Sequence, residues 1–148
     1  MSRQAELLLL DTNVVVQLVR WNEIGQRIDR TFGLLAREEK PLISVVTVGE
    51  CHALAAHRNW GSDKRNVLNA LLHELVIVDI HNGKVLAAYA EIDAFLKKNG
   101  RAVGNNDVWI AACAHAAGAV LLTTDKDFEP LDPKFIRQHY ISPQPPKD

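Results

Sequence analysis

Four acidic residues stand where the chain leaves a short apolar run or enters a helical pattern: Asp11, Glu50, Asp107 and Asp125. Carboxylates that gather in one place repel each other, by about 4 kcal/mol for a pair about 4 Å apart at an effective dielectric constant near 20. A group of four therefore needs protons or a cation, and oxygen ligands suit Mg²⁺ or Mn²⁺. Zinc would require His and Cys residues at ligand spacing, which this sequence does not have.

A carboxylate-held Mg²⁺ or Mn²⁺ in a chain without a nucleotide-binding glycine loop predicts hydrolysis of a phosphodiester. The ion would orient and deprotonate water and stabilise charge on the phosphoryl oxygens. Taken singly, each acid also has a structural explanation, because acids favour turns and the first turn of a helix. Nearby polar residues could hold water or phosphate, or could serve as caps: Thr12, Asn13, Asn105, Asn106, Thr123 and Thr124.

The apolar runs before two of these acids predict buried strands. Leu7–Leu10 ends at Asp11, and Ala119–Thr123 ends just before Asp125. Runs this short and apolar are typical of central strands in a parallel sheet, which are buried on both faces. Right-handed crossovers bring the carboxyl ends of such strands to one edge of the sheet. We therefore expect the acids to meet at that edge.

The segment before Glu50 gives this acid a structural interpretation beside that of a metal ligand. Residues Leu42–Val46 form a second predicted strand, rich in branched side chains. Thr47-x-x-Glu50 then matches a capping box, which predicts a helix from Thr47 to about His57 and gives Glu50 a structural role in its first turn. Asp107 lies in the first turn of another predicted helix, which ends at Gly118.

The other predicted elements complete an alternation of strands and helices. A third strand, Leu75–Asp79, lies at the sheet edge if the strand order is 3-2-1-4, roughly 10 Å from the first strand. We therefore exclude Asp79 from the site. A short final strand is expected near His139–Ile141. Further helices are expected over Val14–Arg20, Ile24–Arg37, a segment opening at Gly61, and Asn82–Lys98 with Leu86 among its inward residues.

Length and composition predict a single soluble domain. The chain has 148 residues, a net charge of −1 and no apolar run of membrane-spanning length. Its two cysteines, Cys51 and Cys113, fall in helical patterns and are expected to be buried thiols of a reducing, cytoplasmic protein. We expect the domain to occupy residues 1–141, followed by a loose proline-containing tail over 142–148.

Four segments together resemble a PIN-domain ribonuclease, and most of all the VapC-type toxins of bacterial toxin-antitoxin pairs. They span nearly the whole chain in the expected order, and the four in sequence are fairly specific. The segments are Leu8-Leu9-Leu10-Asp11-Thr12-Asn13, Ser44-Val45-Val46-Thr47-Val48-Gly49-Glu50, Asn106-Asp107-Val108-Trp109-Ile110-Ala111-Ala112 and Leu122-Thr123-Thr124-Asp125-Lys126-Asp127-Phe128.

The resemblance implies a three-layer α/β/α domain with a central, mainly parallel sheet of four to five strands. It also implies a homodimer that cleaves RNA and is inhibited by an antitoxin whose tail covers the site. Thr12 would be an auxiliary residue and Asp127 a fifth acid. Thr124 departs from the pattern, because these toxins often carry arginine before the fourth acid. The implied Mg²⁺ or Mn²⁺ ligands and catalytic residues are Asp11, Glu50, Asp107 and Asp125.

Two other functions compete with the nuclease. A phosphatase could use Asp11 as its nucleophile. Sites of that kind usually carry a second acid two residues later, where this chain has Asn13. A binding module could keep the same fold and use its helical surface for a protein partner, although an unneutralised set of acids would then leave repulsion in the fold.

Overall fold

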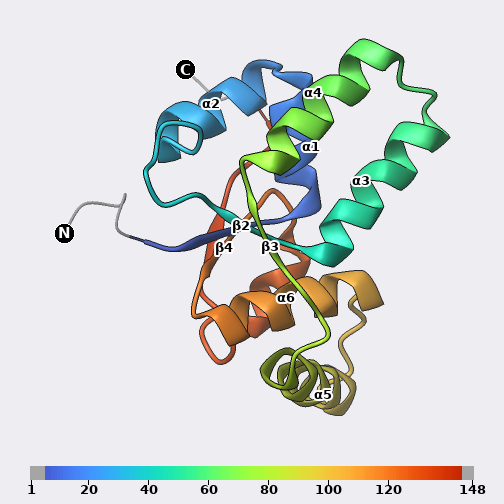
Figure 1. Ribbon diagram of the computed structural model, residues 1–148. Helices are drawn as coiled ribbons and strands as arrows, with labels where there is room; N and C mark the ends of the chain where they lie inside the picture. Colours follow the sequence, from blue (N-terminus) through green and yellow to red (C-terminus); the bar gives the residue numbers. More distant parts are fainter. Residues whose placement is uncertain (1–5, 145–148) are drawn as a thin grey trace.

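The computed structural model describes residues 6–144, which form a five-stranded parallel sheet between two layers of helices (Figure 1). The strand order is β3-β2-β1-β4-β5. The three-layer α/β/α prediction is confirmed. The strands are β1 (Leu8–Leu10), β2 (Leu42–Ser44), β3 (Val76–Val78), β4 (Val120–Thr123) and β5 (Gln138–Tyr140). The helices are α1 (Thr12–Arg20), α2 (Glu23–Phe32), α3 (Val45–His57), α4 (Ser62–His73), α5 (Gly83–Lys98) and α6 (Asn105–Ala117), with a 3₁₀ helix, η2, at Lys126–Leu131.

Alternate leucines of the central strands enter two different hydrophobic cores. Leu8 and Leu10 pack with α1 to α4, whereas Leu9 packs with α5, α6 and η2. On the neighbouring strand, Leu122 belongs to the first core and Leu121 to the second. This alternation explains why β1 and β4 are apolar throughout, because each strand is covered on both faces (Figure 1).

The register of the central strands places their carboxyl ends side by side. Leu10 pairs with Leu122, and the backbone N–H of Asp11 donates to the Leu122 carbonyl at 2.9 Å. β3 lies at the edge of the sheet beyond β2, as the exclusion of Asp79 required. The sheet therefore brings Asp11 and the residues after Thr123 to the same edge.

Three predicted details are wrong. The second strand ends at Ser44 rather than Val46, and α3 begins at Val45 with Ser44 as its N-cap. The second helix ends at Phe32 rather than Arg37, because Gly33 takes a left-handed conformation with φ 59°. Leu86, expected to face inward, is 47% exposed.

The end of the described chain contacts α2. The Arg27 guanidinium donates to the Ser142 carbonyl at 2.6 Å and to the Gln144 carbonyl at 3.3 Å. Of the tail expected to be loose over 142–148, residues 145–148 lie outside the described residues, as do residues 1–5. None of the helices in residues 6–144 is long and apolar enough to cross a membrane.

Candidate active site

Asp11 is the most buried acid of the sheet edge, with 3% of its surface exposed. As the N-cap of α1, its Oδ1 accepts the Thr12 backbone N–H at 2.8 Å. Its Oδ2 accepts the Thr123 hydroxyl at 2.7 Å. The same hydroxyl oxygen accepts the backbone N–H of Asp125 at 2.9 Å. Thr123 therefore ties the carboxylate that follows β1 to the turn that follows β4.

Glu50 reaches the site from the second turn of α3. Its Oε1 accepts the Thr12 hydroxyl at 2.6 Å, and its Oε2 accepts the Asn106 side-chain amide at 3.2 Å. The predicted capping box is wrong, because Ser44 caps this helix and its Oγ accepts the Val46 N–H at 3.1 Å. Glu50 therefore has no capping role and is held by α1 and α6 through side chains.

Thr47 holds a position that sequence reasoning missed. It is fully buried, and its hydroxyl oxygen lies 3.0 Å from that of Thr12. Because the single hydroxyl hydrogen of Thr12 goes to Glu50, the Thr47 hydroxyl is the donor of this contact. Thr47 thus fixes the direction in which Thr12 donates. The Thr-x-x-Glu pattern predicted that Thr47 is a helix cap. Because α3 begins two residues earlier, at Val45, the Thr47 side chain contacts Thr12 instead.

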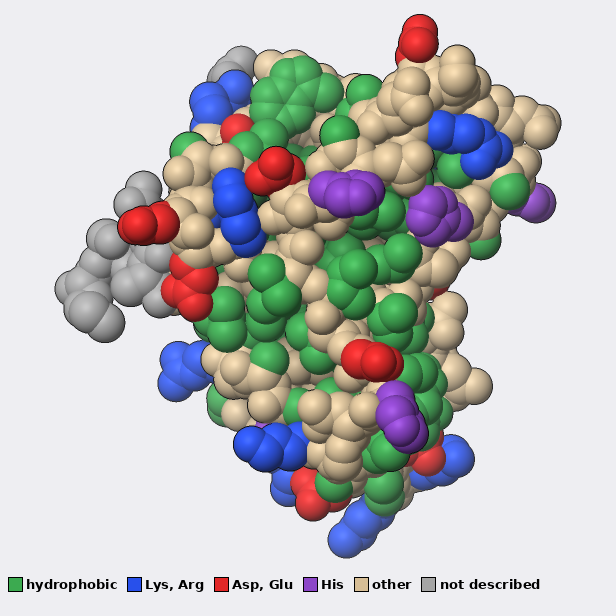
Figure 2. Space-filling model, viewed as in Figure 1, with side chains coloured by type: hydrophobic (Ala, Val, Ile, Leu, Met, Phe, Trp, Pro, Cys, Tyr) green, Lys and Arg blue, Asp and Glu red, His purple; other side chains and the backbone are tan. Residues whose placement is uncertain are grey.

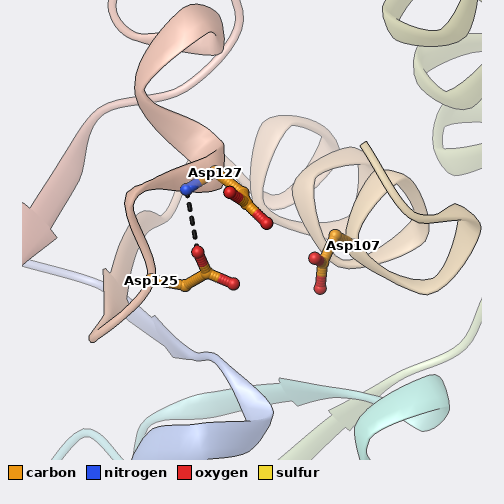
Figure 3. Close-up of side chains that lie close together, drawn as sticks. All are labelled: Asp107, Asp125 and Asp127. Carbon is orange, nitrogen blue, oxygen red and sulfur yellow. Dashed lines mark hydrogen bonds between the residues drawn. The ribbon is translucent and has the colours of Figure 1, made fainter. Parts of the chain in front are cut away.

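The closest group of carboxylates is formed by Asp107, Asp125 and Asp127 (Figure 3). One oxygen from each lies within 4.8 Å of the others, a spacing at which one cation can contact all three. Asp107 comes from the first turn of α6, and Asp125 caps η2 by accepting the Asp127 backbone N–H at 2.9 Å. This contact turns Asp127 towards Asp107, so the residue expected as an auxiliary acid belongs to the closest group.

Burial and mutual repulsion raise the pKa values of two acids. The pKa of Asp11 rises to about 6, chiefly because burial disfavours the charged form; the hydrogen bonds from Thr123 and Thr12 oppose this rise. The pKa of Asp107 rises to about 7, again chiefly through burial, with added repulsion from the other four acids, including Asp11 and Glu50. The five carboxylates therefore act on one another electrostatically, although Asp11 and Glu50 lie outside the group of three.

The donor set fits a hard divalent cation. It offers carboxylate oxygens only, and the rise in the pKa of Asp107 is the energetic sign of an uncompensated acidic cluster. Cysteine chemistry does not fit, because burial raises the pKa of the Cys51 thiol to about 12 and that of Cys113 above its ordinary value. Of the predicted residues, the structure joins Thr12 to Glu50 and brings Asp127 to Asp107 and Asp125.

Curated proteins are similar to most of the chain. The chain is 31% identical over 124 residues to Ribonuclease VapC2 of Haemophilus influenzae (strain KW20 / Rd), covering 82% of this chain and 89% of the relative. It is 28% identical over 133 residues to Ribonuclease VapC2 of Rickettsia felis, covering 89% and 96%.

Solved structures of VapBC complexes contain chains with a similar fold. VapBC2 from Rickettsia felis, bound to a DNA fragment from its promoter, contains a chain with a TM-score of 0.78 and 25% identity, covering 90% of this chain and 98% of that one. VapBC-1 from nontypeable Haemophilus influenzae has a TM-score of 0.72 and 25% identity, covering 90% and 97%. The PIN domain family matches residues 8–132, a range that includes all five acids. The chain therefore belongs to the PIN-domain family.

Proposed function

We propose that this protein is a metal-dependent endoribonuclease that hydrolyses RNA phosphodiester bonds and acts as the toxin of a toxin-antitoxin pair. The observation that carries the proposal is the meeting of five carboxylates, from four separate segments, at the carboxyl edge of one parallel sheet. Relatives named Ribonuclease VapC, and their structures in VapBC complexes, support the choice of RNA as substrate and of an antitoxin as partner.

Each residue has a part in this proposal. Asp107, Asp125 and Asp127 would hold a Mg²⁺ or Mn²⁺ ion, with Asp11 and Glu50 supplying further negative charge beside it. A bound ion of this kind lowers the pKa of water and offsets charge on the phosphoryl oxygens. The hydroxyls of Thr123 and Thr12 hold the carboxylates of Asp11 and Glu50 in fixed orientations.

Cleavage of single-stranded RNA by the purified protein tests this proposal. We expect a mixed-sequence RNA to be cut with Mg²⁺ or Mn²⁺ and to remain intact with EDTA, because EDTA removes the ion that would activate water and offset charge on the phosphoryl oxygens. A DNA strand of the same sequence should remain intact. Cleavage that persists in EDTA would contradict metal dependence, and equal cleavage of the DNA would contradict RNA as the substrate class.

The antitoxin has a suitable docking surface away from the acids. A groove of about 670 Å³ lies between α1, the segment after α2, and α4. Apart from Glu74 it is lined by apolar side chains, of which Trp21, Leu35 and Val67 are each 42 to 49% exposed. Exposed apolar surface of this kind marks protein interfaces. We propose that an apolar segment of the antitoxin lies in this groove.

Val67→Glu is expected to weaken antitoxin binding at least about tenfold, because the charge must be desolvated in the groove. Calorimetric titration with the purified antitoxin of the proposed pair checks the result. Leu86→Glu is the matched control, since Leu86 is 47% exposed on α5 and does not line the groove. Equal affinity for the Val67→Glu variant and the wild type would exclude the groove as the docking site.

We also propose that two copies of the chain form a homodimer. Hydrophobic side chains gather over the middle of the face shown in Figure 2, between α4 and α5, where the edge strand β3 lies. Val76 and Ile77 on this strand are 50% and 49% exposed. An open strand edge with apolar side chains is a surface that folded proteins normally cover. Light scattering should therefore give twice the chain mass of 16.5 kDa.

A further inference from the structure

A second, polar cavity adjoins the acidic cluster. It has a volume of about 550 Å³ and lies where the segment joining α5 to α6 meets the start of η2. Asp127 lines this cavity and also belongs to the closest group of carboxylates. The cavity therefore lies beside the proposed cleavage site.

Two cations line the cavity without an anionic partner. Arg101 and Lys126 are both exposed, and neither forms an ion pair among residues 6–144. Lys126 instead lies over the Tyr140 ring, with its Nζ 5.7 Å from the ring centroid. Asp127 and Glu129 line the same cavity, and within residues 6–144 neither forms an ion pair with these two cations. Their charges are thus available to a ligand.

The segment that carries Arg101 leads to the start of α6. Gly104 is the N-cap of α6 and makes no side-chain hydrogen bond to the first turn. Uncapped N–H groups at a helix N-terminus attract anions. The segment from Gly100 to Val103 lines the cavity, and Gly104 follows it directly in the chain.

We propose that this cavity is a phosphate subsite, in which Arg101 and Lys126 bind a backbone phosphate of the RNA strand next to the phosphate that is cleaved. The inference rests on the proposed ribonuclease function and adds to it the residues that position the strand. The strand must bring a negatively charged backbone up to a group of carboxylates, which repels it. Two unpaired cations beside that group offset the repulsion and fix where the strand lies.

The salt dependence of RNA binding tests the subsite. Binding of a labelled single-stranded RNA is measured by fluorescence anisotropy at fixed Mg²⁺ and increasing KCl, in an Asp11→Asn background that leaves the RNA uncut. On a single strand, each phosphate that the protein neutralises adds about 0.7 to the steepness of log K plotted against log salt. We expect Arg101→Gln/Lys126→Gln to reduce the slope by about 1.4, and Arg101→Lys to retain the parent slope.

The matched control is Arg58→Gln/Lys64→Gln, which makes the same change in charge at the connection between α3 and α4. Its slope should equal that of the parent. Because Lys126 lies between two acids of the cluster, Mn²⁺ affinity is measured for each variant. If Lys126→Gln changes the Mn²⁺ affinity, the test of the subsite rests on the single variant Arg101→Gln. This variant is expected to reduce the salt slope by about 0.7.

The outcomes separate the subsite from the function on which it rests. If the parent binds RNA and Arg101→Gln/Lys126→Gln keeps its slope, the subsite is excluded while the ribonuclease proposal stands. If Arg58→Gln/Lys64→Gln reduces the salt slope equally, the RNA is attracted by the charge of the whole surface, and the subsite is also excluded. If the parent binds no RNA at low salt, the ribonuclease proposal and the subsite fail together.

Discussion

Asp11→Asn is expected to lower the rate of RNA cleavage at least about a hundredfold, since even residues that only support metal ligands contribute factors of about 10 to 100. The fold should persist. In the variant, the asparagine Oδ1 can still accept the Thr12 N–H. In the wild type the Thr123 hydroxyl donates to the Asp11 carboxylate, and in the variant the asparagine Nδ2 can donate to this hydroxyl instead. The variant should therefore lose activity through charge alone.

The same substitution should stabilise the protein in EDTA at neutral pH. Asp11 is 3% exposed and its pKa is raised to about 6, so its ionised form is unfavourable in the metal-free fold. A neutral amide removes this penalty. A higher melting temperature in EDTA, together with the absence of cleavage, would identify Asp11 as a residue kept for function at the expense of stability.

Asp79→Asn provides the control for Asp11→Asn. Asp79 also follows a strand, and its Oδ1 accepts the His81 N–H at 3.0 Å, but β3 lies at the edge of the sheet. This variant should cleave RNA at the wild-type rate. Wild-type cleavage by Asp11→Asn would remove Asp11 from the site, and an equal loss of activity in both variants would point to general damage to the fold.

The metal-free protein should become less stable as the pH rises from about 4 to about 7. A carboxyl group whose pKa is higher in the folded state than in the unfolded state binds its proton more tightly when folded. Its ionisation above pH 4 is therefore easier in the unfolded chain, and the free energy of unfolding falls until the pH passes the folded pKa. These folded pKa values are about 6 for Asp11 and about 7 for Asp107.

The expected effect is large. Asp11 alone, with its pKa raised from 3.8 to about 6, accounts for about 3 kcal/mol at roughly 1.4 kcal/mol per pKa unit. Roughly half of this is lost between pH 5 and pH 7.5, because the unfolded group is already ionised at pH 5, and that half corresponds to a fall of about 3 to 6 °C in melting temperature for a domain of this size. Calorimetry in EDTA at pH 5 and pH 7.5 measures it. Mn²⁺ should restore most of this stability at pH 7.5, because a cation that binds only the folded state stabilises it.

Two controls accompany this measurement. Asp11→Asn should reduce the dependence on pH, and Asp79→Asn should leave it unchanged. A metal-free protein as stable at pH 7.5 as at pH 5 would mean that Asp11 and Asp107 do not share an electrostatically strained site.

The sequence predicted the sheet and the meeting of acids for the same reason. In Leu7–Leu10 and Ala119–Thr123, every residue is apolar or small because both faces of the strand are covered. Once these strands are parallel neighbours, the residues that follow them share an edge. Burial and chain direction, both readable from short patterns, were therefore enough to place Asp11 beside the end of β4.

Local propensity failed at the start of α3. Val45, Val46, Thr47 and Val48 are branched and favour a strand, yet tertiary packing and the Ser44 cap make them helical. The resulting shift moved Glu50 out of the first turn and Thr47 into contact with Thr12. The direction of the Asp127 side chain could not be predicted for a related reason, because it depends on the 3₁₀ turn capped by Asp125, and a turn of this kind has no periodic sequence pattern.

The tie between Thr123 and Asp11 also bears on how the protein is made. The two residues are 112 positions apart, and both Asp125 and Asp127 lie beyond Thr123. A ribosome must therefore translate the chain as far as residue 127 before the last acids of the site exist. Nascent chains and fragments that stop before β4 lack these acids and should not cut RNA. A ribonuclease arranged in this way cannot cleave the messages and ribosomes around it until the segment that follows β4 has been synthesised.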